Sequence, residues 1–173
     1  KVSATLRVEA QRVCRAVPSP ATFFDWATAL GGVNYLLGKP ECVELYQTIK
    51  QEVEERAQKG VGAVVGEKFR LYMDGIMCWP KLGVLAEKLA ALGACAVAGR
   101  YTHLGFYSAP ELIDPQKPLE SLAANTVVLH LNHNIDWIVD RVSQLCQEYS
   151  IDGIVCHAHR TCRPFAAPQL QIM

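Results

Sequence analysis

The first sixty residues of the chain carry hydrophobic positions at helical spacing. A helix of poor period is predicted over residues 1–17. Ser19-Pro20 predicts the start of a second helix, because serine caps helix N-termini and proline suits the first helical position, and Gly31-Gly32 predicts its end. A third, clearer helix is predicted from Pro40 to Gly60. This part of the chain is therefore expected to be helical.

The pattern changes near residue 69, where short apolar runs begin to alternate with helical periodicity. Residues 69–73 predict a strand that ends at Asp74-Gly75, and residues 94–98 predict a second, strongly apolar strand. The leucines within residues 82–92 predict a helix between them. Because a strand–helix–strand order with a crossover of about a dozen residues implies parallel pairing, we expect a parallel sheet.

The last third of the chain repeats this alternation after a long connection. Residues 102–120 contain three prolines and are predicted to be loop-like, and helical patterns from residue 119 to 150 are interrupted near residues 132–134. Residues 154–158 predict another buried-type strand, and residues 165–173 predict the start of a further helix.

These elements predict an α/β fold, an open and mostly parallel sheet with flanking helices, preceded by a helical segment. We expect a helical lead-in over residues 1–64 and an α/β domain over residues 65–173. The last five residues lie inside a predicted helix, so the α/β domain is expected to be incomplete at its C-terminus.

Composition narrows the class of protein. Lysine plus arginine equals aspartate plus glutamate at 17 each, so the balance of charge gives no reason to expect nucleic acid or an anionic membrane as partner. The longest weakly polar run, residues 89–99, is far shorter than the roughly 20 residues that a membrane-spanning helix needs. No secretory leader is recognisable at the start, so a cytoplasmic protein is expected.

Seven cysteines are present, an odd number at irregular spacing, which is unlike a disulfide framework. In a reducing compartment most cysteines are small buried hydrophobic residues. Four fall on apolar helix faces or in a strand and are expected in the core: Cys14, Cys42, Cys95 and Cys146.

Two cysteine-containing loops follow predicted strands. The first loop, Gly75–Pro80, contains Cys78, and the second loop, His159–Pro164, contains Cys162. Parallel strands end at one edge of their sheet, and ligands bind beyond that edge in open α/β sheets. We therefore expect both loops to lie together at the binding edge.

Cys162 has the surroundings of a ligand or a reactive thiol. It precedes a predicted helix whose positive end favours a thiolate, and Arg160 and Arg163 add positive charge. A loop cysteine without a chemical role is the alternative, and spacing alone leaves all three readings open.

Other candidates near this edge are less specific. The segment from Cys156 to Cys162 lacks the second ligand pair of a zinc site, and Cys156 and His157 point to opposite faces of a strand, so Cys156 is expected in the core. His157 and His159 could share a face, toward a pocket or a covering helix. Cys78 could line a pocket or only pack its loop.

His103, His130 and His133 are expected in structural roles, and no phosphate-loop, dinucleotide-binding or nucleophile-elbow motif is present.

Taken together, the two loops resemble a known family. Asp152-Gly153-Ile154-Val155 followed by His159–Pro164 resembles the "DG-hydrophobic … NRSCKP" segment of the iron–sulfur subunits of 2-hydroxyacyl-CoA dehydratases and benzoyl-CoA reductases. Residues 69–71 through Gly75–Pro80 resemble the "R-hydrophobic … GIPCWP" segment of the same subunits. The likeness is good over residues 65–173 and loose before them.

The resemblance implies a role for the chain. Such subunits pair into heterodimers, each binds a [4Fe–4S] cluster through three cysteines, and an ATP-dependent activator protein donates a low-potential electron that reduces an acyl-CoA thioester to a ketyl radical. The family's "SCKP" cysteine is a cluster ligand, and this role carries over to Cys162. The two loops then provide the candidate substrate-pocket residues, namely Cys78, Trp79, His159 and Arg160.

The sequence departs from the family pattern at three positions of the second loop, where His159, Thr161 and Arg163 replace Asn, Ser and Lys. Polarity or charge is kept at each. The resemblance places the other cluster ligands in an upstream domain, so the chain alone is expected to hold no stable cluster, since a cubane needs several thiolates, and to show no turnover. The first loop leans slightly toward the benzoyl-CoA reductases. The alternative is a non-catalytic α/β scaffold or small-ligand-binding module.

Overall fold

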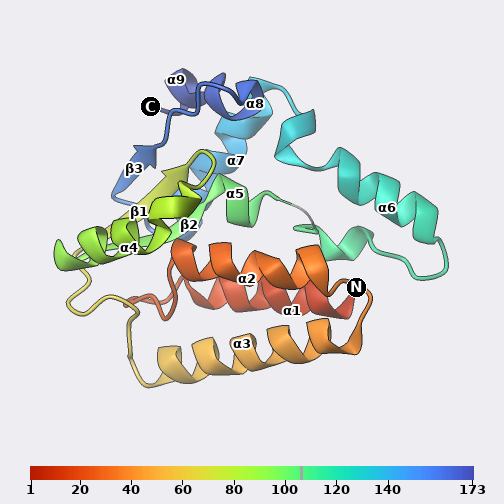
Figure 1. Ribbon diagram of the computed structural model, residues 1–173, viewed down its shortest axis with the longest axis horizontal. Helices are drawn as coiled ribbons and strands as arrows, with labels where there is room; N and C mark the ends of the chain where they lie inside the picture. The colour runs from red at the N-terminus through yellow and green to blue at the C-terminus, as the bar shows by residue number, and fades with distance from the viewer. Residues whose placement is uncertain (106) are drawn as a thin grey trace.

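The computed structural model describes residues 1–105 and 107–173 and shows a small sheet enclosed by helices (Figure 1). The described part of the chain contains three strands, which are β1 (Phe69–Asp74), β2 (Ala94–Gly99) and β3 (Gly153–Cys156). Their order is β2-β1-β3, and both pairings are parallel. The predicted α/β fold with an open parallel sheet is therefore confirmed.

Three helices precede the sheet and pack beside it, α1 (Val2–Val13), α2 (Phe23–Tyr35) and α3 (Pro40–Gln58). The predicted bounds of the second of these were wrong. Thr22 forms a reciprocal capping box with Asp25, so that α2 begins at Phe23, and the helix continues through both glycines to Tyr35. Neither glycine ends α2. Gly32 instead lies where the Tyr46 side chain of α3 packs closely against α2.

The remaining helices connect the strands or follow them. They are α4 (Leu82–Ala91), α5 (Arg100–His103), α6 (Pro118–Val127), α7 (Ile135–Glu148), α8 (Arg163–Ala166) and α9 (Gln169–Ile172). Single 3-10 turns lie at Trp79–Lys81, Pro110–Leu112 and His130–Asn132. The last predicted helix is in fact two short ones, because Pro168 lacks the amide that a continuous helix would require.

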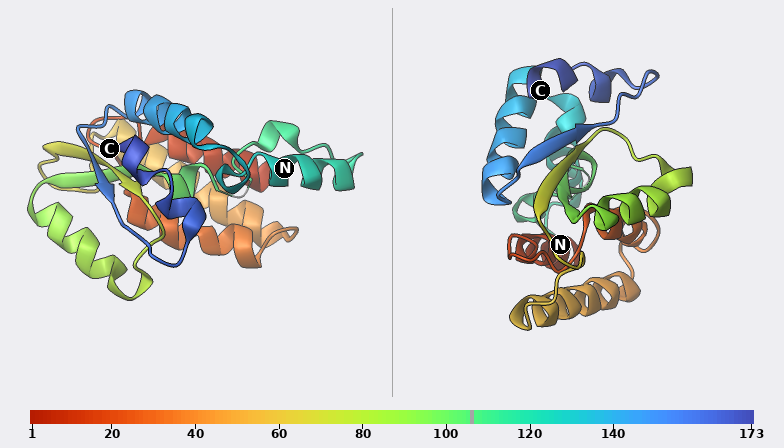
Figure 2. Two further views of the ribbon diagram at one scale, coloured as in Figure 1. Left: turned by 90° about the horizontal axis from the view of Figure 1, so that it is seen from above. Right: turned by 90° about the vertical axis from the view of Figure 1, so that its left-hand side faces the viewer.

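Helices cover both faces of the sheet (Figure 2). On one face, Tyr72 and Val97 pack with α1 and with Ile138 and Val142 of α7. On the other face, Met73 and Ala96 pack with α2, and with the leucines of α4. Residues from the first sixty positions thus contribute to both clusters.

The two outer strands differ in burial. Every residue of β2 is buried, whereas β3 is only partly buried and Val155 is 37% exposed. The expectation of a buried strand over residues 154–158 was therefore wrong, and Cys156, expected in the core, is half-buried. The physical reason is position, because in the described part of the chain nothing pairs with the outer side of β3.

The described helices include none that combines the length and the apolar character needed to cross a membrane.

Candidate functional site

The two predicted loops lie together at the carboxyl edge of the sheet. Asp74 at the end of β1 pairs with Cys156 at the end of β3, and the His157 amide donates to the Asp74 carbonyl at 2.8 Å. The His157 Nδ1–H donates to the carbonyl of Ile76 in the first loop. The backbones approach so closely that a Cβ on Gly75, whose φ is +118°, would lie 2.5 Å from the His157 carbonyl oxygen. Both loops therefore follow parallel strands that end at the same edge of the sheet, as expected.

A cavity of about 370 Å³ opens beside the first loop, and we call it the sheet-edge cavity. Its walls come from α2, α4, the ends of β1 and β3, and the first loop. They are mostly apolar: Phe23, Phe24, Met73, Ile76, Met77, Leu82, Leu85 and Val155. A cavity of this kind suits a compact apolar group rather than a highly charged one.

The aspartate, lysine and histidine residues of this cavity differ in burial. Asp74 is 1% exposed, and the partners of its carboxylate, Arg100 and Gln169, are not among the residues that line the cavity. Lys81 and His157 are exposed, so they lie near the opening. The opening of the cavity thus carries a lysine and a histidine, whereas the Asp74 carboxylate binds groups outside the cavity lining.

A buried ion pair lies at the same edge of the sheet. Arg100 Nη2 lies 2.9 Å from Asp74 Oδ2, and both side chains are inaccessible to solvent. The same guanidinium donates to the Phe165 carbonyl at 2.7 Å and stacks over the Phe165 ring at 4.6 Å. Gln169 Nε2 donates to Asp74 Oδ2 at 3.2 Å and to the His157 carbonyl at 3.0 Å. These contacts join the ends of β1, β2 and β3 to the segment that follows Cys162.

The other carboxylate oxygen of this pair has no such contact. Asp74 Oδ1 is buried, and no hydrogen-bond partner for it lies within residues 1–105 and 107–173. Burial raises the pKa of the Asp74 carboxyl, an effect that the neighbouring Arg100 guanidinium opposes without cancelling.

Cys162 occupies the N-cap position of α8 and is half-buried, so its sulfur is not sealed in the core. Its carbonyl accepts hydrogen bonds from the amides of Phe165 and Ala166, and its amide donates to His159. The expected helix does follow Cys162, but α8 has only four residues, so its aligned peptide dipoles are few and its positive end favours a thiolate only weakly.

The four substrate-pocket candidates separate in the structure. Cys78 lines the sheet-edge cavity, whereas the other three are not among its lining residues. Trp79 is 49% exposed and meets the Tyr101 ring edge-on at 6.2 Å. His159 is half-buried beside the Thr161 hydroxyl at 3.1 Å, and Arg160 is exposed.

Several residues at this site were missed by the sequence analysis. Phe23 and Phe24 come from the helical lead-in, and no local pattern shows that α2 reaches the sheet edge. For Arg100 and Asp74, however, the sequence contains a feature that could have indicated their place at the site. Each is a charged residue directly at the end of an apolar strand, and in a parallel sheet such positions meet at one edge.

The donor set for a metal cluster is incomplete in this part of the protein. Residues 1–105 and 107–173 bring no three histidine, cysteine or acidic side chains into a group that could hold a metal ion. Cys162 alone does not satisfy a cubane, which is held by several thiolates.

Two histidines, His103 and His130, are buried. His130 Nδ1 bonds the Leu104 carbonyl at 2.7 Å, and its ring meets Phe165 edge-on at 4.9 Å. Burial lowers the pKa of His130 to about 4 and that of His103 to about 3. Both imidazoles are therefore neutral at physiological pH and act as packing groups.

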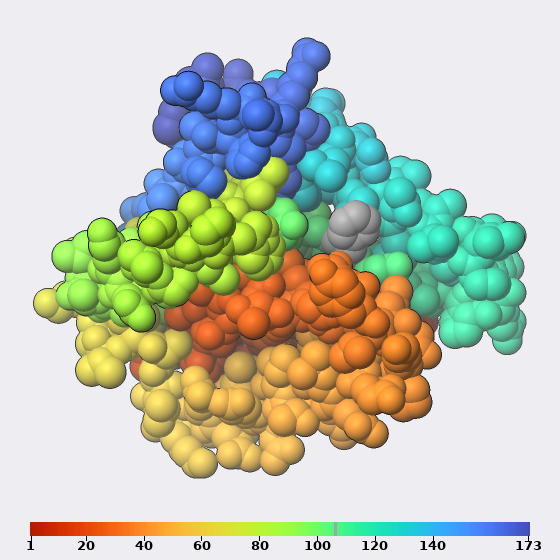
Figure 3. Space-filling view, viewed as in Figure 1, coloured from red at the N-terminus to blue at the C-terminus, as the bar shows by residue number. Residues whose placement is uncertain are grey.

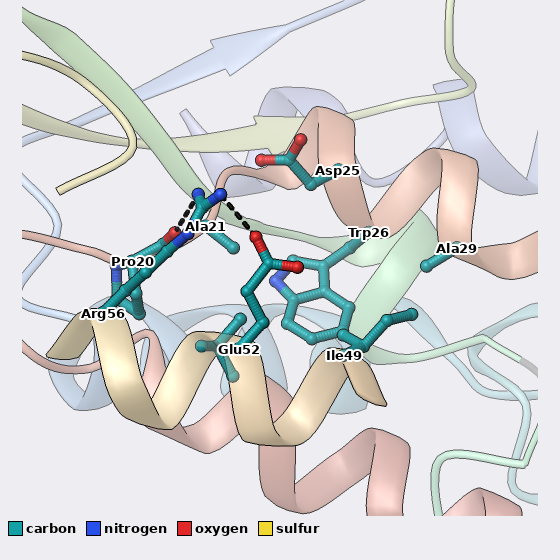
Figure 4. Close-up of a pocket in the computed structure, with 9 residues that line it drawn as sticks. Pro20, Ala21, Asp25, Trp26, Ala29, Ile49, Glu52 and Arg56 are labelled. Carbon is teal, nitrogen blue, oxygen red and sulfur yellow. Dashed lines mark hydrogen bonds and ion pairs between the residues drawn. The ribbon is translucent and has the colours of Figure 1, made fainter. Parts of the chain in front are cut away.

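A second cavity lies between α2 and α3 and has a different character (Figure 4). It measures about 160 Å³, and Arg56 at its rim donates to the Pro20 carbonyl at 3.4 Å and pairs with Glu52. Cys78, Trp79, His159, Arg160 and Cys162 all lie outside its lining. This groove is a packing feature between two helices and is not part of the candidate site.

The fold and site define an α/β protein with a ligand-sized cavity at the carboxyl edge of a parallel sheet. The chain belongs to the family described as "2-hydroxyglutaryl-CoA dehydratase, D-component", whose model matches residues 3–173. The resemblance inferred from the two loops is thereby confirmed, and the match extends through the helical lead-in.

Named relatives agree with this assignment. The chain is 29% identical over 170 residues to a benzoyl-CoA reductase subunit of Thauera aromatica, covering 90% of this chain and 38% of that protein. It is 29% identical over 157 residues to the alpha subunit of (R)-2-hydroxyisocaproyl-CoA dehydratase of Clostridioides difficile, covering 90% and 37%. For the alpha subunit of (R)-2-hydroxyglutaryl-CoA dehydratase of Acidaminococcus fermentans the identity is 26% over 157 residues, covering 89% and 31%. The chain therefore spans less than two fifths of the length of these relatives.

Proposed function

We propose that these residues form part of an iron–sulfur subunit of an ATP-dependent, radical-type 2-hydroxyacyl-CoA dehydratase or benzoyl-CoA reductase that acts in the cytoplasm. The observation that carries this proposal is the family match over residues 3–173, of which the Cys162 loop at the sheet edge is a part. The relatives are named as subunits, which supports a heterodimer with a related second subunit. An electron-donating activator protein completes the proposed set of partners.

In this proposal Cys162 is one thiolate ligand of a [4Fe–4S] cluster. Its half-buried position at a loop between a strand end and α8 leaves the sulfur accessible to a group bound beyond the sheet edge. The other ligands would come from parts of the subunit outside these residues, because the described part supplies no complete set. When bound, such a cluster supplies low-potential electron transfer.

The chain's own side chains would bind and shield the acyl-CoA. The apolar walls of the sheet-edge cavity would disfavour water beside a bound group, and Cys78 is one of the lining residues. His157 and Lys81 stand near its opening, on the side of the second loop and the first loop respectively. His159 and Arg160 belong to the same second loop as Cys162 and remain candidates for contacts to the substrate outside the cavity.

The test is anaerobic reconstitution of the intact subunit that contains these residues, compared with its Cys162→Ser variant. The native subunit is expected to develop an iron–sulfur absorption band and a matching electron paramagnetic resonance signal after reduction. The variant is expected to bind less iron and to show an altered signal, because one thiolate ligand is replaced by a weaker hydroxyl.

Cys146→Ser is the matched control, since Cys146 packs against the core on α7. It is expected to reconstitute as the native subunit does. If Cys162→Ser leaves iron content and spectrum unchanged, Cys162 is not a ligand and the proposed role is wrong.

A further inference from the structure

A polar cleft lies on the face of the sheet that α1 and α7 cover, opposite to the face of α2 and α4. Two adjoining cavities of about 270 and 360 Å³ form this cleft, and both are lined by His103, Leu104, Ser108 and Arg141. We call it the arginine cleft. None of its lining residues belongs to the lining of the sheet-edge cavity, so the two sites are separate.

Three arginines line the smaller cavity of the arginine cleft, and their charges are only partly neutralised. Arg15 forms an ion pair with Glu148, which lines the same cavity. Arg12 and Arg141 form no ion pair within residues 1–105 and 107–173, since Arg141 donates to the neutral amide oxygen of Gln144. Two guanidinium charges therefore border this cavity without a carboxylate partner.

His103 contributes an unpaired polar atom beside these charges. Its Nδ1 lies 2.8 Å from the Thr102 hydroxyl and 3.4 Å from the Gly99 amide, and neither residue lines the cleft. The opposite edge of the ring therefore borders the cleft. On that edge Nε2 is buried, and the described part of the chain offers it no hydrogen-bond partner. Because neutral imidazole can carry its proton on either nitrogen, Nε2 can donate toward an anion.

The larger cavity adds an apolar wall next to Arg141. This wall is formed by Leu104, Val128 and the half-buried ring of Trp137. The acidic residue of this cavity, Glu111, is exposed to solvent. An anion held by the arginines would thus have an aromatic surface beside it for any organic group that it carries.

We propose that the arginine cleft binds phosphate monoesters, with the phosphate held by Arg12 and Arg141 and its organic group beside Trp137. Near neutral pH a phosphate monoester carries close to two negative charges, which match the two unpaired guanidiniums. Guanidinium groups also bind phosphate oxygens through paired hydrogen bonds. A carboxylate has one charge and would leave one arginine without compensation. The proposal concerns another face of the sheet than Cys162 and needs no cluster.

The test is isothermal titration calorimetry of the intact protein at about pH 7.5 and low, constant ionic strength, because salt screens exposed charges. The three probes are phenyl phosphate, inorganic phosphate and acetate. Phenyl phosphate is expected to bind saturably and several-fold more tightly than inorganic phosphate, because its ring contacts the aromatic wall. Inorganic phosphate is expected to bind at least about tenfold more tightly than acetate.

Four variants assign the binding to this cleft. Arg12→Gln and Arg141→Gln are each expected to weaken phenyl phosphate binding about tenfold, because a hydrogen bond to a charged group is lost. Arg56→Gln removes the same charge from α3, outside the cleft, and is the matched control that should change nothing. Glu148→Gln removes the carboxylate that neutralises Arg15, so it is expected to tighten binding several-fold. Impaired folding would not produce such a gain.

The proposal is overturned if phenyl phosphate shows no saturable binding, or if it binds no more tightly than inorganic phosphate. Equal losses in Arg141→Gln and Arg56→Gln would also overturn it, since they would indicate a general attraction by surface charge. The same holds for a folded Glu148→Gln variant whose affinity does not rise. Cluster assembly in the Cys162→Ser experiment does not enter these outcomes, so this proposal and the proposed function fail independently.

Discussion

At the scale of single residues, the carboxyl edge of the sheet depends on a charge pair that solvent does not reach. Asp74 and Arg100 stand at the ends of neighbouring strands, and Arg100 also holds the main chain at Phe165, three residues after Cys162. Removing both charges from water is costly, so such a pair stabilises a structure only while both partners are present. Its value here is the position that it gives to the second loop.

Replacing Asp74 with asparagine tests this pair. Asp74→Asn leaves the Arg100 charge buried without a carboxylate, and the free energy of unfolding is expected to fall by about 3–5 kcal/mol. Urea denaturation measures the loss. The double variant Asp74→Leu, Arg100→Met is expected to lose clearly less free energy of unfolding than Asp74→Leu and Arg100→Met lose together as single variants, because it leaves no unpaired buried charge. Additive losses would contradict this interpretation.

The His130 imidazole makes stability depend on pH. Burial lowers the pKa of this imidazole from the ordinary 6.5 to about 4. Between these two pH values the imidazole is mostly protonated in the unfolded chain and mostly neutral in the folded protein. Stability is therefore full above about pH 6.5 and falls as pH decreases toward 4. Between pH 7 and pH 5 the expected loss from His130 is about 2 kcal/mol.

The measurement is denaturant unfolding at several pH values. His130→Asn is expected to reduce the pH-dependent part of the loss, although it also lowers stability at pH 7 by removing the contact with Phe165. The control His133→Asn retains the buried imidazole of His130 and should keep the pH dependence. An unchanged slope in His130→Asn would show that this histidine is not the titrating group.

At the scale of elements, the approach of α2 to α3 brings the lead-in helices against the sheet. The Tyr46 hydroxyl of α3 donates to the Ala29 carbonyl at 2.7 Å and accepts from the Val33 amide at 3.2 Å. This contact requires a residue without a side chain at position 32, where a Cβ would lie 2.7 Å from the Tyr46 oxygen. α2 also contributes Phe23 and Phe24 to the lining of the sheet-edge cavity.

The neighbouring glycines of α2 therefore respond to alanine in opposite directions. Gly32→Ala is expected to destabilise the protein by about 1–3 kcal/mol, because a packed helix contact must open. Gly31 has open space at its Cβ position, and Gly31→Ala is expected to stabilise by about 0.5–1 kcal/mol through helix propensity. Thermal unfolding of the two variants separates these effects, and a common sign would contradict the packing argument.

The same glycines show where sequence reasoning reaches its limit. Local patterns predicted β1, α3, α4 and β2 well, since apolar runs, a proline start and a glycine end are local signals. They ended α2 too early, because the reason for Gly32 is a tyrosine on another helix. The same patterns predicted that β3 is longer and more buried than it is. β3 is an edge strand because of the strand order, and no single segment of the sequence shows that order.

For the candidate site the outcome is similar. Parallel pairing correctly brought the two loops to one edge, because that follows from topology alone. The Asp74–Arg100 pair and the α2 walls of the cavity depend on side chains brought together from distant segments, so spacing along the chain could not reveal them.

At the scale of the whole molecule, the cysteines divide by location. Cys14, Cys42 and Cys95 are buried as expected, and burial raises the pKa of Cys14 to about 11 and of Cys95 to about 12. Cys146, also expected in the core, is half-buried on α7. Cys78, Cys156 and Cys162 are half-buried and gather near the carboxyl edge of the sheet. In the space-filling view, the segments that carry this edge form a continuous surface above the lead-in helices (Figure 3).

Thiol labelling of the native protein tests that division. Cys162 and Cys78 are expected to react with a small disulfide reagent well before Cys14, Cys42 and Cys95, which should react only after unfolding. Peptide mapping by mass spectrometry identifies the labelled sites. A native protein in which Cys162 stays unlabelled while the buried thiols react would contradict the exposed position of the second loop, and would favour a scaffold without a chemical role for this cysteine.

The central place of β1 also governs the order of assembly on the ribosome. β1 receives its second neighbour from a segment much later in the chain, where the Asp152 carboxylate accepts a hydrogen bond from the Arg70 amide, 82 positions earlier. In a nascent chain β1 can pair with β2 early, but the other edge of β1 stays unpaired until β3 has been synthesised. Long-range parallel pairing is intrinsically slow, so the newborn protein exposes a strand edge until β3 has been synthesised and has paired, and protection by a chaperone during that interval is expected to raise its yield.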